Sequence, residues 1–200
     1  MRVSRSQAEQ NRQTVIDVAS RLFRERGFDG IGVKDLMEGA GLTQGAFYKQ
    51  FASKDDLVAQ ASRRALESCA NRWSAAVAAS PEDPLGALID FYLSTGHREE
   101  RMDGCPVVAL GSDAARQGIE VKASFEAGIR DYLEMLGPWV GEAGGDAPSG
   151  KAMAILSTMI GAVVLARAVN DEELSKQFLQ AAAKSVMGSS AGAAQKGQLR

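Results

Sequence analysis

The chain has 200 residues, of which 45% are hydrophobic and 24% are charged, so it can bury a core and does not have the composition of a disordered chain. Its two cysteines, Cys69 and Cys105, lie far apart, which excludes a disulfide scaffold and a Cys-x-x-Cys metal site. The net charge is −2, but residues 1–64 hold 11 Lys/Arg against 8 Asp/Glu and the remainder is acidic. A basic head on an acidic body is typical of a polyanion-binding module joined to a partner domain.

The apolar pattern predicts an all-α chain of about nine helices. Proline is scarce, and no apolar run alternates with the period of two that a half-buried strand requires. In chain order, the predicted helices are 8–26, 33–40, 44–50, 53–79, 85–96, 106–117, 119–140, 151–169 and 172–187. We expect a loose arm over 1–7, loops over 97–105 and 141–150, and a disordered tail over 188–200. Residues 1–13 are polar, so we expect no signal peptide.

Capping residues mark several of the predicted helix ends. Gly27 stands where a glycine commonly ends a helix, and Thr43 and Ser53 stand where hydroxyl side chains commonly begin one. Pro106 is suited to the first position of a helix, where its missing N–H is not needed.

The longest apolar run, residues 152–169, is interrupted by Ser157, Thr158 and Arg167. A membrane span needs about 20 predominantly apolar residues. We therefore interpret this run as a buried helix, apolar and covered on nearly all sides, and expect a cytoplasmic protein without a membrane contact.

Two short helices, 33–40 and 44–50, are separated by a tight turn that contains Gly41. This spacing is typical of a helix-turn-helix. Spacing alone leaves a second interpretation open, a corner of a three-helix bundle that binds no DNA.

The second of these helices has an apolar back and a polar front. Phe47 and Phe51 are expected to anchor it to a core, whereas Gly45 and Ala46 are small enough to let its backbone approach a large flat partner. Such a helix suits the major groove of DNA.

Residues 14–61 resemble the TetR family of transcriptional repressors. The matching residues are Ala19, Leu22, Phe23, Gly27, Phe28, Val33, Asp35, Leu36, Ala40, Gly41, Leu42, Thr43, Gly45, Ala46, Phe47, Tyr48, Phe51, Ser53, Lys54 and Leu57. The resemblance implies a helix-turn-helix DNA-binding domain over 1–52 and a ligand-binding and dimerisation domain over 53–187, with the helix 53–79 connecting the two.

The resemblance also implies which side chains contact DNA. Phosphate contacts fall on Thr43, Tyr48 and Lys54, with Lys34 as a further backbone contact, and base reading falls on Gln44 and Lys49. Gly45 and Ala46 complete this expected DNA-binding set.

The sequence departs from the family pattern at two positions. Gly32 replaces the usual capping Ser or Thr, so a hydroxyl is missing there. Met37 replaces a small residue, which alters the packing expected between the two short helices.

In the family, the last two long helices, here 151–169 and 172–187, form a four-helix dimer interface. We therefore expect a homodimer whose interface includes small and apolar side chains of both helices. These residues are Ser157, Gly161, Val164, Phe178 and Ala182. The alternative is that both helices are ordinary core helices of a monomer.

These features predict a homodimeric repressor that binds a near-palindromic double-stranded operator and is released by a small-molecule inducer. The inducer pocket is expected among the helices from 53–79 to 151–169. We interpret His97 as a solvated loop residue, and Trp73 and Trp139 as packing.

We expect no enzyme activity, metal or cofactor, because no Ser/His/Asp, phosphate-loop or zinc spacing is present. An all-α transferase and a DNA-organising protein without a ligand remain as rival classes.

Cys105 stands at the start of the predicted helix 106–117, where free N–H groups lower the pKa of a thiol. The segment Gly104–Leu110 resembles a stretch of one TetR subgroup in which some members sense electrophiles or oxidants. Two observations oppose a sensing role. Asp103 disfavours a thiolate nearby, and a cysteine among apolar residues is often simple packing.

Overall fold

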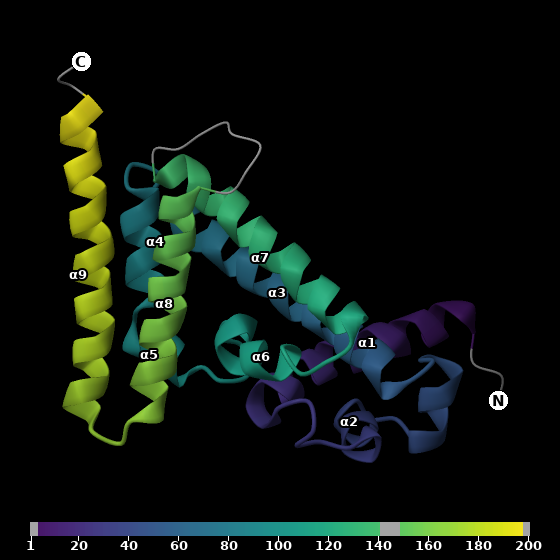
Figure 1. The fold of residues 1–200 in the computed structure, drawn as a ribbon. Helices are drawn as coiled ribbons and strands as arrows, with labels where there is room; N and C mark the ends of the chain where they lie inside the picture. The colour runs from purple at the N-terminus through teal and green to yellow at the C-terminus, as the bar shows by residue number, and fades with distance from the viewer. Residues whose placement is uncertain (1–3, 141–148, 198–200) are drawn as a thin grey trace. The chain divides into compact units, whose positions relative to one another are not determined.

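The computed structural model describes residues 4–140 and 149–197, and in this part the chain is all helical, which confirms the predicted fold class. The described residues form nine α-helices, labelled in Figure 1, and one short 3₁₀ helix, η1. Their bounds are α1 Arg5–Arg26, α2 Val33–Gly39, η1 Gln44–Lys49, α3 Lys54–Ala78, α4 Pro84–Tyr92, α5 Thr95–Glu99, α6 Pro106–Ala114, α7 Ile119–Trp139, α8 Gly150–Ala168 and α9 Glu172–Gly197.

The chain divides into two compact units whose membership is not sequential. Unit 1 contains residues 1–69 and 101–128, and unit 2 contains 70–100 and 129–200. The helices α3 and α7 therefore each contribute to both units. Unit 1 contains the predicted DNA-binding domain together with α6. The domain boundary predicted at residue 52 does not include α6 with that domain. That boundary stays a prediction.

Unit 1 is built around the apolar face of α1. The helices α2 and α6 both pack on α1, and η1 packs on α2. A Cβ added at Gly39 would lie 3.1 Å from a methyl group of Val18, which shows how closely α2 approaches α1. The buried apolar side chains of this core include Val15, Ile16, Ala19, Phe23, Phe28, Leu36, Met37, Phe47, Phe51 and Leu57.

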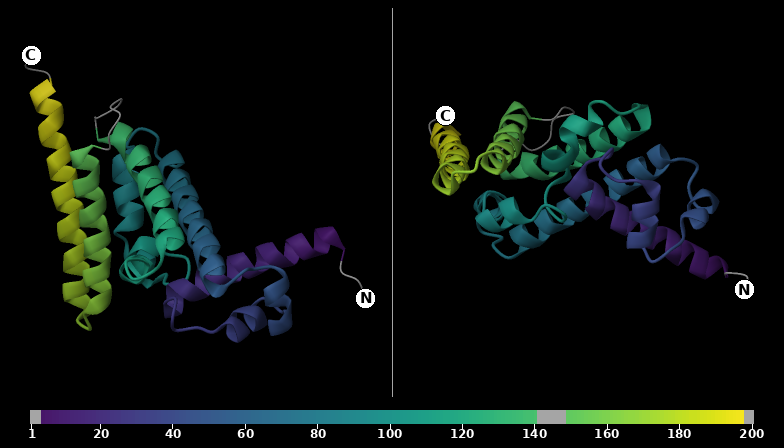
Figure 2. Two further views of the ribbon diagram at one scale, coloured as in Figure 1. Left: turned by 45° about the vertical axis from the view of Figure 1, so that its right-hand side comes forward. Right: turned by 90° about the horizontal axis from the view of Figure 1, so that it is seen from below.

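Unit 2 contains an aromatic cluster, which we define as Trp73, Tyr92, His97 and Tyr132. The ring of Trp73 stacks on Tyr132 at a centroid distance of 4.5 Å and meets the edge of Tyr92 at 5.6 Å. Trp73 is fully buried, as predicted, and Trp139 is half-buried. In the same unit α8 and α9 run side by side in opposite directions (Figures 1 and 2).

Most predicted helix starts are confirmed, and side-chain caps explain them. The hydroxyl of Ser53 accepts a hydrogen bond from the amide of Asp56 at 3.1 Å, and Pro106 occupies the first turn of α6. The first helix begins earlier than predicted, because the hydroxyl of Ser4 accepts from the amide of Gln7. The predicted arm over 1–7 is therefore wrong from Arg5 onward.

The predicted continuous helix 85–96 is wrong, because α4 ends at Tyr92 and a new helix, α5, follows. Ser94 begins α5 by accepting from the amide of His97 at 3.0 Å. The solvated loop predicted for His97 is also wrong, since its side chain is 3% exposed. Its Nδ1 lies 2.7 Å from the carbonyl oxygen of Tyr92, and this hydrogen bond offsets part of the free-energy cost of burying the imidazole.

The disordered tail predicted over 188–200 is wrong as far as Gly197, where α9 ends. Gly188 does not stop the helix, because the alanines, glutamine and lysine that follow are strong helix formers. The other helices end within a few residues of their predicted bounds. The predicted loop 141–150 lies mostly outside the described residues, and α8 already begins at Gly150, after Ser149.

The helix α8 is long and apolar enough to cross a membrane by length and composition, although 39% of this segment is buried within the structure. One face packs inward through Ile155, Met159 and Val163. Its other face exposes Val164 and Leu165, at 41% and 47%. Burial on nearly all sides, expected from the sequence, is therefore not achieved by a single chain.

Candidate nucleic-acid interface

The segment from α2 to η1 forms the helix-turn-helix that the sequence predicts. Gly41 adopts a φ of +70°, a left-handed conformation that favours glycine. Around it the amide of Leu42 donates to the carbonyl of Met37 at 2.8 Å, and the amide of Gly41 donates to Glu38 at 2.9 Å. These two bonds satisfy the last carbonyls of α2 and fix the direction in which η1 leaves the turn.

The second element is a 3₁₀ helix over Gln44–Lys49, not the α-helix predicted over 44–50. Thr43 is its N-cap residue, as predicted, but its hydroxyl accepts no capping hydrogen bond. In the tighter 3₁₀ pattern the amide of Ala46 donates instead to the backbone carbonyl of Thr43 at 3.0 Å.

The two faces of η1 differ sharply in exposure. Phe47 and Phe51 are 1% and 3% exposed, and their stacked rings lie 5.4 Å apart, so the predicted anchors are confirmed. Tyr48, between them in sequence, is 71% exposed. Ala46 is half-buried, and the exposed residues of the predicted DNA-binding set here are Thr43, Gln44, Gly45, Tyr48 and Lys49.

Gly45 has no role in the packing of this chain. A Cβ added there would meet nothing within 4 Å, and its φ is not positive. Glycine nevertheless costs about 0.5–1 kcal/mol relative to alanine within a helix. A partner that comes close to the backbone would explain the glycine, whereas the fold itself does not.

The two lysines of the predicted set have different surroundings. The Lys34 side chain is 68% exposed and lies 3.8 Å from Glu38, one helical turn away. Lys54 is half-buried, and its Nζ donates a hydrogen bond of 2.6 Å to the carbonyl oxygen of Phe28. The structure thus holds the Lys54 side chain against the turn that follows α1.

Both departures from the family pattern are visible in α2. Gly32 is the N-cap residue and provides no side-chain hydrogen bond, as expected. Met37 is fully buried in α2, the helix that packs on α1 and η1.

Cys105 is fully buried and is the N-cap residue of α6. The buried guanidinium of Arg24 donates to the carbonyl of Gly104, the preceding residue, at 3.0 Å. Asp103 is paired with Arg21 at 3.0 Å. Sequence reasoning missed Arg24 here, although an arginine on the apolar stripe of α1 was a usable signal.

The predicted dimer residues are spread over several environments. Ser157 and Val164 are exposed on α8, and Gly161 is half-buried with open space where a Cβ would be. On α9, Phe178 is half-buried and Ala182 is buried within the chain. The α8 residues thus lie on its uncovered face, whereas Ala182 belongs to the intrachain packing.

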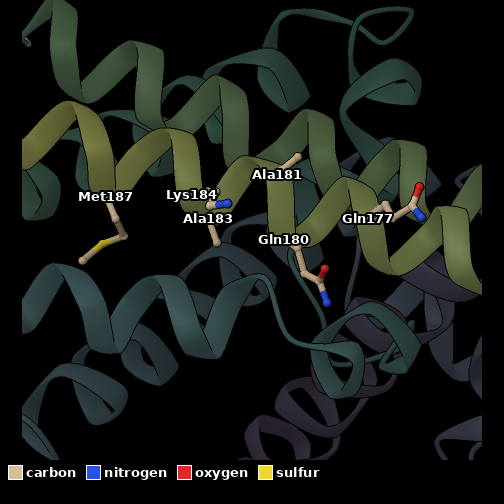
Figure 3. Close-up of a pocket in the computed structure, with 6 residues that line it drawn as sticks. All are labelled: Gln177, Gln180, Ala181, Ala183, Lys184 and Met187. Atoms are coloured by element: carbon tan, nitrogen blue, oxygen red, sulfur yellow. The ribbon is translucent and has the colours of Figure 1, made fainter.

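A surface groove of about 650 Å³ lies along α9. Figure 3 shows that Gln180, Ala183 and Met187 project to one side of this helix. The lining residues of the groove are Gln177, Gln180, Ala181, Ala183, Lys184 and Met187. The groove belongs to α9 alone and does not test the inducer pocket predicted among the preceding helices. In the ranges 4–140 and 149–197, no group of three His, Cys, Asp or Glu could hold a metal ion.

The family model described as "Bacterial regulatory proteins, tetR family" matches residues 15–61. The chain is 31% identical over 92 residues to the HTH-type transcriptional regulator AcrR of Shigella flexneri, covering 46% of this chain and 43% of that protein. It is 30% identical over 119 residues to the HTH-type transcriptional repressor KstR2 of Mycobacterium tuberculosis, covering 60% and 58%. The chain thus matches about half the length of these relatives.

Solved structures extend the likeness of fold to nearly the whole chain. A TetR transcriptional regulator from Chloroflexus aurantiacus superposes with a TM-score of 0.75 at 25% identity, covering 91% of this chain and 96% of that one. The reduced form of Escherichia coli NemR superposes with a TM-score of 0.72 at 19% identity, covering 88% and 95%. Residues 15–61, which contain the helix-turn-helix, thus match the TetR family of transcriptional regulators, and the chain has the fold of solved TetR-family regulators.

Proposed function

We propose that the chain is a cytoplasmic homodimeric repressor that binds a near-palindromic operator through η1 and releases it when a small molecule binds. The observation that carries the DNA-binding part is η1, which buries Phe47 and Phe51 and presents Gln44, Tyr48 and Lys49 to solvent. Exposed glutamine and lysine supply hydrogen bonds to base edges, and the tyrosine hydroxyl supplies one to phosphate.

The experiment is a map of genomic sites bound by the full chain, followed by titration of the purified protein with the most enriched sequence. A repressor predicts a few near-palindromic sites next to promoters. A DNA-organising protein predicts many sites of low sequence preference and no release by a small molecule. Absence of DNA binding at physiological salt would reject the proposal.

The aromatic cluster of unit 2 supports an inducer site in the helical body. The Nε1–H of fully buried Trp73 has no hydrogen-bond partner among the described residues. A buried donor without an acceptor costs roughly 1–3 kcal/mol. We infer that the inducer has a hydrogen-bond acceptor that reaches this indole. In a Trp139→Phe variant, Trp73 is the remaining tryptophan, so its fluorescence should change when an inducer binds; an unchanged signal would place the site elsewhere.

A thiol-reactive electrophile is the second candidate inducer, favoured by the position of Cys105 at the start of α6. The Arg24 guanidinium donates to the carbonyl of Gly104, the residue before Cys105, and both Arg21 and Arg24 pair with Asp103. Because Cys105 is fully buried, the electrophile must reach it through local opening of this segment. Operator release should occur in the wild type and not in Cys105→Ser. Equal release from both proteins, or from neither, would leave Cys105 as packing.

A further inference from the structure

The backbone of Phe28 is held from two sides within unit 1. Its amide donates to the carboxylate of Asp113 on α6 at 3.3 Å, and its carbonyl oxygen accepts from Nζ of Lys54, the first residue of α3, at 2.6 Å. The ring of Phe28 is 2% exposed and meets the edge of Phe23 at 5.4 Å. A residue near the end of α6 and the first residue of α3 therefore share one anchor.

The turn that carries Phe28 needs this anchor. Gly27 ends α1 with a φ of +76°, a conformation that glycine adopts more readily than any other residue. A Cβ at Gly27 would lie 2.9 Å from Oδ2 of Asp113, so the carboxylate occupies the space that the glycine leaves open. The other carboxylate oxygen of Asp113 pairs with the guanidinium of Arg116.

We propose that Asp113 is a positioning residue for DNA binding. It fixes the backbone of Phe28, and the carbonyl of Phe28 in turn sets where the Lys54 ammonium points. An ammonium group has three donors, so the bond to Phe28 leaves two for a phosphate oxygen. Lysine is flexible, and an ammonium already held in one place loses less conformational freedom on binding. The inference rests on the proposed DNA-binding function and adds to it a residue outside the helix-turn-helix.

The test is a double-mutant cycle on affinity and its salt dependence, with the full chain and a fixed operator duplex. Lys54→Ala should reduce the slope of log K against log salt by about 0.9, the value for one phosphate contact. Asp113→Ala should weaken binding by about three- to tenfold and reduce the same slope, since it loosens the same contact. The double variant should bind as Lys54→Ala does, because the effect of Asp113 passes through Lys54.

Two control variants separate this role from general damage. Asp113→Asn keeps an acceptor oxygen for the Phe28 amide and should retain most of the affinity. Arg116→Ala removes the other partner of Asp113, from a side chain that is 68% exposed, and should change affinity little. Additive effects of Asp113→Ala and Lys54→Ala, or an unchanged salt slope in Asp113→Ala, would overturn the proposal.

A measurement without DNA distinguishes this inference from the proposed function. In ¹⁵N-lysine NMR spectra, the hydrogen-bonded Lys54 ammonium should exchange its protons with water more slowly than Lys34. Asp113→Ala should remove that protection, and retained protection would overturn the inference. If Asp113→Ala loses this protection but the wild-type protein binds no DNA, the link between Asp113 and Lys54 stands and only the proposed function is rejected.

Discussion

Phe47 and Tyr48 are neighbours in the chain with opposite surroundings, and this contrast identifies the side of η1 that faces a partner. Phe47 packs against Phe51, and Tyr48 contacts the edge of Phe47 while remaining 71% exposed. A large aromatic side chain loses stabilisation by remaining in water. Its exposure is therefore better explained by a contact outside this chain than by the fold.

The proposed division between phosphate and base contacts is tested at Tyr48 and Gln44. Tyr48→Phe removes one exposed hydroxyl, so it should weaken binding to every duplex by a similar factor and leave stability unchanged. Gln44→Ala should instead relax preference at one base pair, costing about 1–3 kcal/mol of discrimination there. Binding measured against all single-base variants of the operator separates the two. The same uniform loss from both variants would contradict the assignment.

The pKa of His97 is lowered from 6.5 to about 4, mainly by burial; the hydrogen bond to the Tyr92 carbonyl and the charge of Glu100 raise it, and Arg167 and Arg72 lower it. Because the folded pKa lies below the unfolded one, protonation favours the unfolded chain as the pH falls from 6.5 towards 4. The free energy of unfolding should therefore drop by roughly 2 kcal/mol between pH 7 and pH 5 through this residue.

Urea denaturation at the two pH values measures this loss, and His97→Gln, which does not titrate, should reduce it. His97 is the only histidine in the chain, so its imidazole NMR signal is assigned without further labelling. The signal should stay at its neutral position down to about pH 5. A midpoint near 6.5 would show that His97 is solvated, as the sequence alone suggested.

At the scale of elements, the sequence predicted those boundaries that a local side chain determines. Ser53 and Pro106 act within one helical turn, and both start a helix where expected. The phenylalanine anchors of η1 were predictable for the same local reason. His97 was not, because its burial depends on Tyr92 and on helix α8, whose Arg167 donates to the carbonyl of His97 at 3.0 Å.

Other errors arose where local signals compete. Gly188 is a common helix stop, yet helix formers on both sides of it carry α9 through to Gly197. The residues Gln44–Lys49 have the polarity of a recognition helix but form a 3₁₀ helix. The role proposed for Asp113 could not be predicted, because it depends on a contact between residues far apart in sequence.

In η1, one methyl group added at Gly45 should affect the stability of the protein and its binding to DNA differently. Gly45→Ala adds a Cβ into open space, so the free energy of unfolding should stay the same or rise by up to about 1 kcal/mol. If the backbone of η1 lies close to DNA, the same methyl should weaken operator binding by about tenfold or more. Thermal unfolding and operator titration of one sample test both. A more stable protein with unchanged affinity would show that Gly45 does not approach DNA.

At the scale of the whole molecule, the composition of α8 is explained only if something covers its exposed face. Met153, Val164 and Leu165 are 44%, 41% and 47% exposed, which is costly for apolar side chains in a protein of marginal stability. A second copy of the same helix would cover this face symmetrically. A dimer would also place two helix-turn-helix segments on one duplex, with half-sites about one helical turn or a little more apart.

Gly161→Arg tests this assembly without disturbing the single chain. Gly161 is half-buried, and a Cβ there meets nothing within 4 Å, so an arginine can fit on an isolated α8. In a dimer seam the same arginine would be a buried unpaired charge, which is strongly destabilising. We expect a folded monomer by light scattering, with normal helical content and much weaker binding to the near-palindromic operator. Gly118→Arg, also in open space but outside α8, is the matched control and should remain a dimer. A Gly161→Arg protein that stays a soluble, DNA-binding dimer would place the interface on another surface, and the exposed apolar face of α8 would then need a different partner.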